Sequence, residues 1–138
     1  MLKPKTKKII RLLAKKYHLK VVMLFGSLAK NNAQAKSDID LAVLAAPDFY
    51  EKSFADFTYD LMKAEDAEKR EIEVVPITGY NPILLFNIFN DGEPVYVSSK
   101  EEYSRLRSWA RFTYEDSRRF FSGRERLLEK RMERLKII

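Results

Sequence analysis

The chain has 138 residues, a size that suits one compact domain and leaves little room for a second one. Apolar residues make up 46% and charged residues 33%, which are ordinary fractions for a globular protein, so neither disorder nor a fibrous repeat is expected. The absence of cysteine excludes disulfides, thiol catalysis and the common zinc frameworks, which leaves oxygen ligands for any metal. The longest apolar runs are too short to cross a bilayer and the basic start lacks a signal-peptide core, which predicts a cytoplasmic protein with no membrane contact.

Basic residues outnumber acidic ones, 26 to 20, and the net charge is +6. The excess lies mainly at the two ends of the chain, and residues 1–20 contain no acid at all. Such a segment suits contact with nucleic acid, with nucleotide phosphates or with an acidic protein. A plain solvated helix face explains it equally well.

The first elements are a helix and a buried strand. Residues 4–18 repeat apolar positions at helical spacing, which predicts an amphipathic helix. Residues 21–25 are a continuous apolar run that ends at Gly26, which predicts a buried strand stopping at a turn. A short helix over 27–33 and a loop over 34–37 are expected next.

The middle of the chain predicts two more strands around a helix. Residues 38–44 begin with polar and apolar alternation, so Asp38 and Asp40 are expected on one face of a strand. Apolar spacing of three and four predicts one helix over residues 49–64. Residues 71–77 predict a third strand, with Glu71 and Glu73 on one face.

The last third is predicted to be mostly helical. A helix over 83–89, a turn at Asp91-Gly92 and a strand over 95–97 precede a helix over 100–121, which Gly123 is expected to interrupt. One apolar group in this helix is expected to be core packing: Tyr103, Leu106, Trp109, Ala110 and Phe112. A later apolar stripe is expected to bind a partner or another copy of the chain: Leu127, Leu128, Met132 and Leu135.

The chemistry predicted from these elements is transfer of a phosphorus group. A magnesium ion prefers carboxylate oxygens and bridges to substrate phosphates, and Asp38 and Asp40 are spaced for it. Two ions side by side usually need a third carboxylate, for which Glu73 is the best placed candidate. Gly26 allows close approach to a phosphate, and Ser27 adds a hydroxyl at a helix start that favours anions.

Each feature alone is weak, but their order is characteristic. A strand, Gly26-Ser27, ten intervening residues and then Asp38-x-Asp40 opening another strand resembles the polymerase beta type nucleotidyltransferase superfamily. Within it, Gly26-Ser27-Leu28-Ala29-Lys30 followed by Ser37-Asp38-Ile39-Asp40-Leu41 resembles the core of the minimal nucleotidyltransferases, the antitoxin partners of HEPN-domain toxins. The strand around Glu73, the segment from Pro82 to Tyr96 and the later Tyr114-Glu115-Asp116 also resemble that family.

The resemblance implies the nucleotidyltransferase half-fold, ATP with magnesium, and transfer of AMP to a tyrosine of the HEPN ribonuclease toxin, which silences the toxin. It makes Asp38, Asp40 and Glu73 the catalytic and metal-binding residues, with the family's third acid more often Asp than Glu. The ATP-binding residues would be Gly26, Ser27, Lys30 and Lys36.

The predicted fold is α/β or α+β, a small mixed sheet with helices packed on it. Residues 1–100 are expected to form the nucleotidyltransferase core and residues 101–138 a helical extension of the same domain. Three alternatives stay open: an RNA acceptor, a small-molecule acceptor, and an antitoxin that acts by binding alone. A homo-oligomer or an oligomer with the toxin is also expected.

Overall fold

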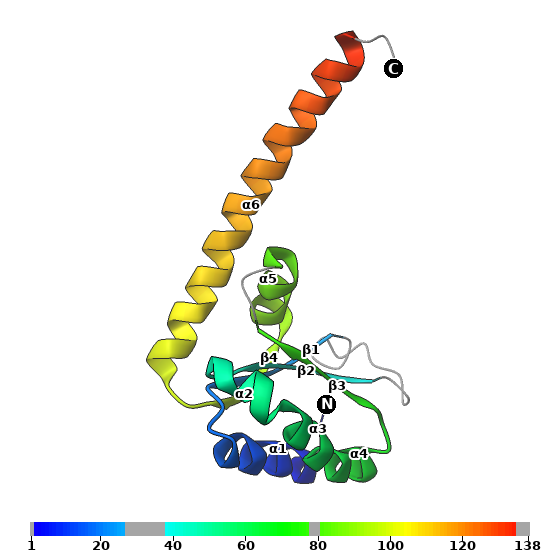
Figure 1. Cartoon of the computed structure of the whole chain (residues 1–138), viewed down its shortest axis with the longest axis vertical. Coiled ribbons are helices and arrows are strands. Elements are labelled where there is room, and N and C mark those ends of the chain that lie inside the picture. The colour runs from blue at the N-terminus through cyan, green and yellow to red at the C-terminus, as the bar shows by residue number, and fades with distance from the viewer. Residues whose placement is uncertain (1, 27–37, 78–80, 135–138) are drawn as a thin grey trace.

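The computed structural model describes residues 2–26, 38–77 and 81–134. In this part of the chain a four-stranded sheet is covered by helices on both faces (Figure 1). The strands are β1 (Val21–Phe25), β2 (Ile39–Leu44), β3 (Ile72–Pro76) and β4 (Glu93–Val97). The helices are α1 (Pro4–Lys16), α2 (Pro47–Lys52), α3 (Phe54–Asp60), α4 (Met62–Glu68), α5 (Pro82–Asp91) and α6 (Lys100–Arg134). The predicted mixed sheet with flanking helices is confirmed.

The strand order is β3-β2-β1-β4. It brings the starts of some strands and the end of another to the same end of the sheet. β1 runs antiparallel to both β2 and β4, whereas β2 and β3 are parallel. The end of β1 therefore lies beside the starts of β2, β3 and β4. Four candidate positions fall on described residues, and all of them lie at this end of the sheet, which we call the carboxylate edge: Gly26, Asp38, Asp40 and Glu73.

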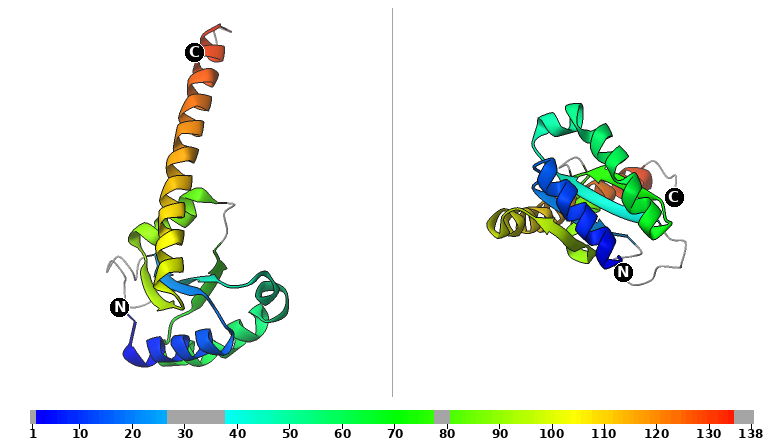
Figure 2. Two further views of the ribbon diagram at one scale, coloured as in Figure 1. Left: turned by 90° about the vertical axis from the view of Figure 1, so that its left-hand side faces the viewer. Right: turned by 90° about the horizontal axis from the view of Figure 1, so that it is seen from below.

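Each face of the sheet has its own core. Val22, Leu24 and Leu41 pack with α1 and the α2–α4 segment, and α1, α3 and α4 lie below the sheet in Figure 1. Figure 2 shows the same arrangement from two further sides. Met23 and Ala42 pack with α5 and with Ala110 of α6 on the opposite face. Successive residues of β1 point to opposite faces of the sheet, and both faces are covered. The strand therefore appears in the sequence as an unbroken apolar run.

The prediction of a single helix over residues 49–64 is wrong, because the structure has three short helices in the range 47–68. The backbone leaves helical geometry at Ser53, with φ −121° and ψ −9°. This bend lets Phe49 and Phe57 both reach the ring of Tyr17, at centroid distances of 6.2 and 5.6 Å. Burial of these aromatic rings outweighs continuity of the helix, since tertiary packing routinely overrides local propensity.

The expected interruption at Gly123 is also wrong, because α6 is continuous for 35 residues. A glycine within a helix costs only about 1 kcal/mol relative to alanine, which the surrounding strong helix formers can offset. The first turns of α6 pack on α5, where the rings of Phe86 and Tyr114 stack at 4.1 Å. Beyond α5 the helix projects away from the rest of the molecule (Figures 1 and 2).

The predicted packing group of α6 is only partly buried. Ala110 is buried and Tyr103 and Leu106 contact the core, but Trp109 is 43% exposed and Phe112 is 71% exposed. The helix has a neighbour on one side only, so residues at helical spacing on its other sides stay in solvent. In the later stripe, Leu127 is exposed, whereas the side chains of Leu128 and Met132 and the whole of Leu135 lie outside what the structure describes.

Candidate nucleotidyl-transfer site

Two of the predicted carboxylates are direct neighbours across the sheet. Asp40 pairs with Glu73 in the parallel register of β2 and β3, and with Phe25 in the antiparallel register of β1 and β2. Residues opposite one another in a sheet project from the same face. Strand register therefore brings together acids that lie 33 positions apart in the sequence.

The pleat of the sheet also decides which face carries these acids. Ala42 packs against the α5 side of the sheet, and Asp40 lies two positions before it on the same strand. Val75 packs on that side too, and Glu73 lies two positions before it. Because side chains alternate along a strand, Asp40 and Glu73 both project on the face that α5 and α6 cover. Asp38 precedes β2 and is exposed.

Gly26 makes close contact with Asp40 at the turn that ends β1. Its φ of +78° lies in the left-handed region that favours glycine. A Cβ atom built on Gly26 would overlap Oδ2 of Asp40. Glycine therefore suits this position for two reasons: it adopts the conformation of the turn, and it leaves the space that the Asp40 carboxylate occupies.

The site concentrates negative charge on a partly buried carboxyl group. Burial raises the pKa of Asp40 above its ordinary value, and the nearby charges of Glu73 and Asp38 raise it further. All three causes oppose ionisation of Asp40, so a bound cation would relieve each of them.

The donor set fits a magnesium ion. Among the described residues, no three acidic or histidine side chains already converge into a metal cage. Magnesium does not require one, since it is usually held by one or two carboxylates together with substrate phosphates and water. The negative charge around Asp40 is what such a site needs from the protein.

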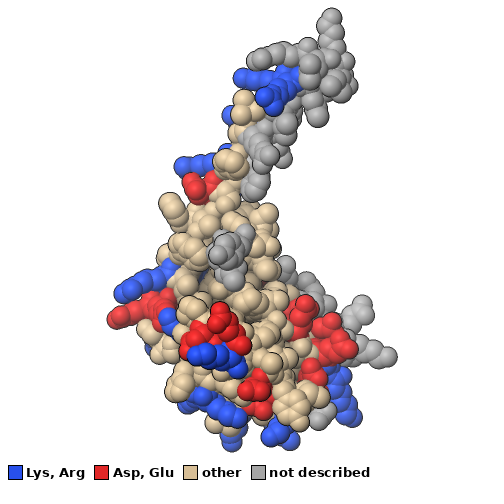
Figure 3. Space-filling view, in the orientation of Figure 1, with Lys and Arg blue, Asp and Glu red and all other residues tan. Residues whose placement is uncertain are grey.

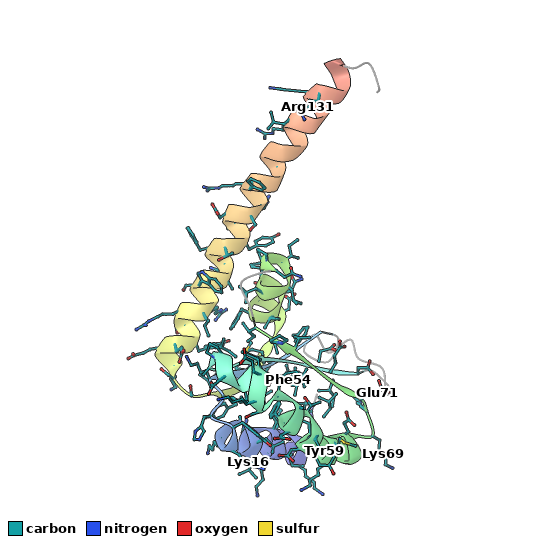
Figure 4. The ribbon with its side chains drawn as sticks, in the orientation of Figure 1. Lys16, Phe54, Tyr59, Lys69, Glu71 and Arg131 are labelled. Atoms are coloured by element: carbon teal, nitrogen blue, oxygen red, sulfur yellow. The ribbon has the colours of Figure 1, made fainter. Side chains whose placement is uncertain are left out.

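Three predicted ATP-binding residues, Ser27, Lys30 and Lys36, lie outside the described residues, as do the short helix and the loop expected over 27–37. Glu71 lies at the carboxylate edge just before β3 (Figure 4), and its backbone carbonyl accepts a hydrogen bond from the N–H of Ile39 at 2.8 Å. Its expected place on the same face as Glu73 stays a prediction, because Glu71 is not part of the strand.

One ion pair at this edge was not anticipated from the sequence. Glu93 opens β4 opposite Leu24, two positions before Gly26, and its Oε1 lies 3.4 Å from Nζ of Lys7. The sequence indicated Lys7 only as one member of the basic start. Since Leu24 packs toward α1, this pair borders the site on the other face of the sheet. The one sequence feature that pointed to this ion pair was an acidic residue, Glu93, directly after the turn at Gly92.

The fold is that of a nucleotidyltransferase, and comparison with known families agrees. The model of the family described as Polymerase beta, Nucleotidyltransferase matches residues 7–101, which include every described residue of the carboxylate edge. The chain therefore belongs to this family. No protein in a curated collection matches the sequence at a significant level.

Several solved structures share the fold. A crystal structure of a toxin–antitoxin with AMP-PNP aligns with a TM-score of 0.65 at 19% identity, covering 91% of this chain and 98% of the other. A structure of a tri-AMPylated Shewanella oneidensis HEPN toxin in complex with an MNT antitoxin aligns at 0.60 and 18% identity, covering 93% and 97%. The toxin–antitoxin MntA-HepT aligns at 0.59 and 18% identity, covering 94% and 99%. In the described ranges, no helix is long and apolar enough to span a membrane.

Proposed function

We propose that this protein is an antitoxin that transfers AMP from ATP to a tyrosine hydroxyl of a HEPN-domain ribonuclease toxin and thereby silences it. The observation that carries the proposal is the register of Asp40 with Glu73 beside the Gly26 turn, within a chain of the nucleotidyltransferase family. The structural neighbours support the acceptor, since they include a HEPN toxin that carries AMP groups and a toxin–antitoxin with an ATP analogue.

Each residue at the carboxylate edge would have a distinct task. Asp38 and Asp40 would hold magnesium, which when bound neutralises charge on the triphosphate and on the departing pyrophosphate. Gly26 leaves room for the Asp40 carboxylate at the turn, and Ser27 would donate its hydroxyl to the phosphates. Lys30 and Lys36 would contribute positive charge toward the phosphates.

The reaction itself is an in-line substitution at the α-phosphorus. The tyrosine oxygen forms a bond to that phosphorus while the bond to the pyrophosphate oxygen breaks, and the pyrophosphate leaves with its electron pair. Glu73 would accept the proton of the hydroxyl, which raises the nucleophilicity of the oxygen. The position of Glu73 opposite Asp40 places a base next to the proposed metal ligands.

A passive antitoxin is the second candidate, and one observation favours it. The resemblance to the minimal nucleotidyltransferases implies Asp more often than Glu at position 73, and the extra methylene of Glu73 displaces the carboxylate by about one bond length relative to a magnesium shell of roughly 2.0–2.1 Å. RNA or a small molecule as acceptor is a third reading. The AMPylated HEPN toxin among the structural neighbours favours an acceptor supplied by a partner protein.

The deciding experiment first looks for a HEPN-domain reading frame next to this chain's gene and then uses its product as the partner. The two purified proteins are incubated with ATP and magnesium, and the mass of the partner is measured intact and after digestion. Addition of adenylyl groups to a tyrosine is expected, together with loss of ribonuclease activity. Neutralisation without any added mass would establish the passive antitoxin instead, and labelling of added RNA would establish the third reading.

A further inference from the structure

Five exposed arginines of α6 share one side of the helix: Arg107, Arg111, Arg118, Arg119 and Arg126. Their spacings place them within about a third of the helix circumference at 3.6 residues per turn. At a rise of about 1.5 Å per residue, the row is roughly 28 Å long. Figure 3 shows basic side chains at intervals along this projecting helix, and Figure 4 places Arg131 near its far end.

The surface between these arginines is shallowly hollowed. One depression is lined by Arg107, Ser108, Arg111 and Phe112, and a second by Glu115, Arg118, Arg119, Ser122, Gly123 and Arg126. A Cβ atom built on Gly123 would have no neighbour within 4 Å. Because serine and glycine separate the arginines, an extended ligand can approach the helix backbone between the guanidinium groups.

Positive charge predominates on this side of the helix. Glu115 is the single acid among the residues that line the two depressions. Among the side chains that the structure describes, no ion pair within 4.0 Å involves any of the five arginines. A row of five cations with Glu115 as the one acid in the two depressions attracts a polyanion, and guanidinium groups pair with phosphate oxygens through two parallel hydrogen bonds.

The low apolar content of the two depressions favours a nucleic acid over a protein as their ligand. A protein interface normally has an apolar centre surrounded by polar residues, whereas the only large apolar side chain in the two depressions is that of Phe112. Phe112 is 71% exposed and lies directly beside Arg111. An exposed aromatic ring within a basic surface offers a stacking platform to an unpaired base, which single strands present and duplexes do not.

We infer that this side of α6 binds single-stranded RNA, with the arginines on the phosphates and one base stacked on Phe112. The inference goes beyond adenylyl transfer and does not depend on it, since none of these residues belongs to the carboxylate edge. RNA bound here is a ligand of the helix and not an acceptor of AMP.

The test measures binding of a fluorescein-labelled 20-nucleotide single-stranded RNA to the full chain by anisotropy, over a series of salt concentrations and without ATP. Substitution of Arg107, Arg111 and Arg118 by alanine is expected to weaken binding at least about tenfold and to lower the slope of log affinity against log salt by about 2, since each phosphate contact on a single strand contributes about 0.7. The matched control replaces Lys5, Lys8 and Lys15, three exposed cations of α1, by alanine. This control loses the same charge and is expected to keep the affinity within about twofold.

Stacking is tested separately with Phe112→Ala, which is expected to weaken binding about 5- to 150-fold, with Leu12→Ala as an exposed apolar control on α1. Circular dichroism of each variant checks that α6 remains helical. Absence of binding by the wild type at low salt would overturn the inference, as would equal losses in the arginine and lysine variants. Equal competition by duplex DNA or by polyglutamate would also overturn it, because the helix would then select negative charge alone or an acidic protein.

Discussion

Asp40 of β2 lies directly opposite Glu73 of β3, and the charge of Glu73 adds to the burial that raises the pKa of Asp40. Two acids held together in this way destabilise the protein unless they bind a cation or a proton. Carboxylates with perturbed pKa values cluster at functional sites, which supports the catalytic role proposed for this pair.

The first prediction concerns the proposed metal ligands. Replacing Asp38 and Asp40 together by alanine is expected to abolish adenylyl transfer and the dependence of ATP binding on magnesium, while the fold remains intact. Both acids lie at the start of β2, where loss of a carboxylate removes no core packing. Isothermal titration calorimetry of wild type and double variant, with and without magnesium, measures the effect. Equal metal-dependent affinity in the two proteins would refute the metal assignment.

The second prediction separates the enzyme from the passive antitoxin. Glu73→Gln removes the charge but nearly preserves the shape, so transfer of AMP is expected to fall by about a hundred- to ten thousandfold through loss of the general base alone. ATP is still expected to bind, because Asp38 and Asp40 remain.

The control for Glu73 is Glu71→Gln, which neutralises an exposed acid just outside the same strand. Intact-mass measurements of the partner over time report the rate for each variant. If Glu71→Gln is the slower of the two, Glu71 is the base and the assignment of Glu73 is wrong.

The third prediction tests the close contact of Gly26 with Asp40. Gly26→Ala is expected to lower the free energy of unfolding by about 1–2 kcal/mol, since a side chain at a left-handed position is strained. Its Cβ atom would also displace the Asp40 carboxylate, so transfer is expected to fall as well.

Gly123→Ala is the matched control, because its Cβ atom would enter open space within α6. It is expected to raise the free energy of unfolding by about 0.5–1 kcal/mol and to leave transfer unchanged. Urea unfolding and the adenylylation assay measure both variants. Similar stability changes at the two glycines would show that Gly26 has no special role.

The fourth prediction is a pH dependence of stability at the contact between α1 and α3. The Tyr17 hydroxyl donates to Oδ2 of Asp60 at 2.6 Å, and Nζ of Lys16 donates to the same atom at 3.1 Å. The Tyr17 hydroxyl, and after it Lys16, lowers the pKa of Asp60. The Asp60 hydrogen bond in turn raises the pKa of Tyr17.

The two shifts limit this stabilisation to a window of pH. A lowered folded-state pKa of Asp60 contributes stability above its ordinary value of about 3.9, and this stability is lost as the pH falls through the lowered pKa. A raised folded-state pKa of Tyr17 contributes stability that is lost as the pH rises through that pKa. Tyr17→Phe is therefore expected to be less stable than wild type at pH 7, with the difference shrinking toward both extremes.

Thermal unfolding across the pH range measures this difference, and Tyr59→Phe serves as control because the Tyr59 side chain on α3 is 72% exposed. A constant difference between wild type and Tyr17→Phe at every pH would mean that Tyr17 contributes packing only.

Local patterns in the sequence were enough to predict the strands, the first helix and the acids at the start of β2. Val21–Phe25 is a strand in the structure as predicted, and the first helix ends within two residues of its expected end. Such patterns work because the period of apolar residues reports which face of an element is buried. The order Gly26, Asp38, Asp40 likewise indicated the family before any contact was known.

The tertiary structure alone decided how these pieces meet. The pairing of Asp40 with Glu73 depends on β3 adding in parallel to β2, and no local pattern specifies a partner strand. The overlap that a Cβ atom on Gly26 would have with Asp40 is a contact between two strands. The exposure of Trp109 and Phe112 also depends on tertiary structure. Apolar periodicity indicates that a helix has a side suited to burial. Only the assembled fold determines whether another element covers that side.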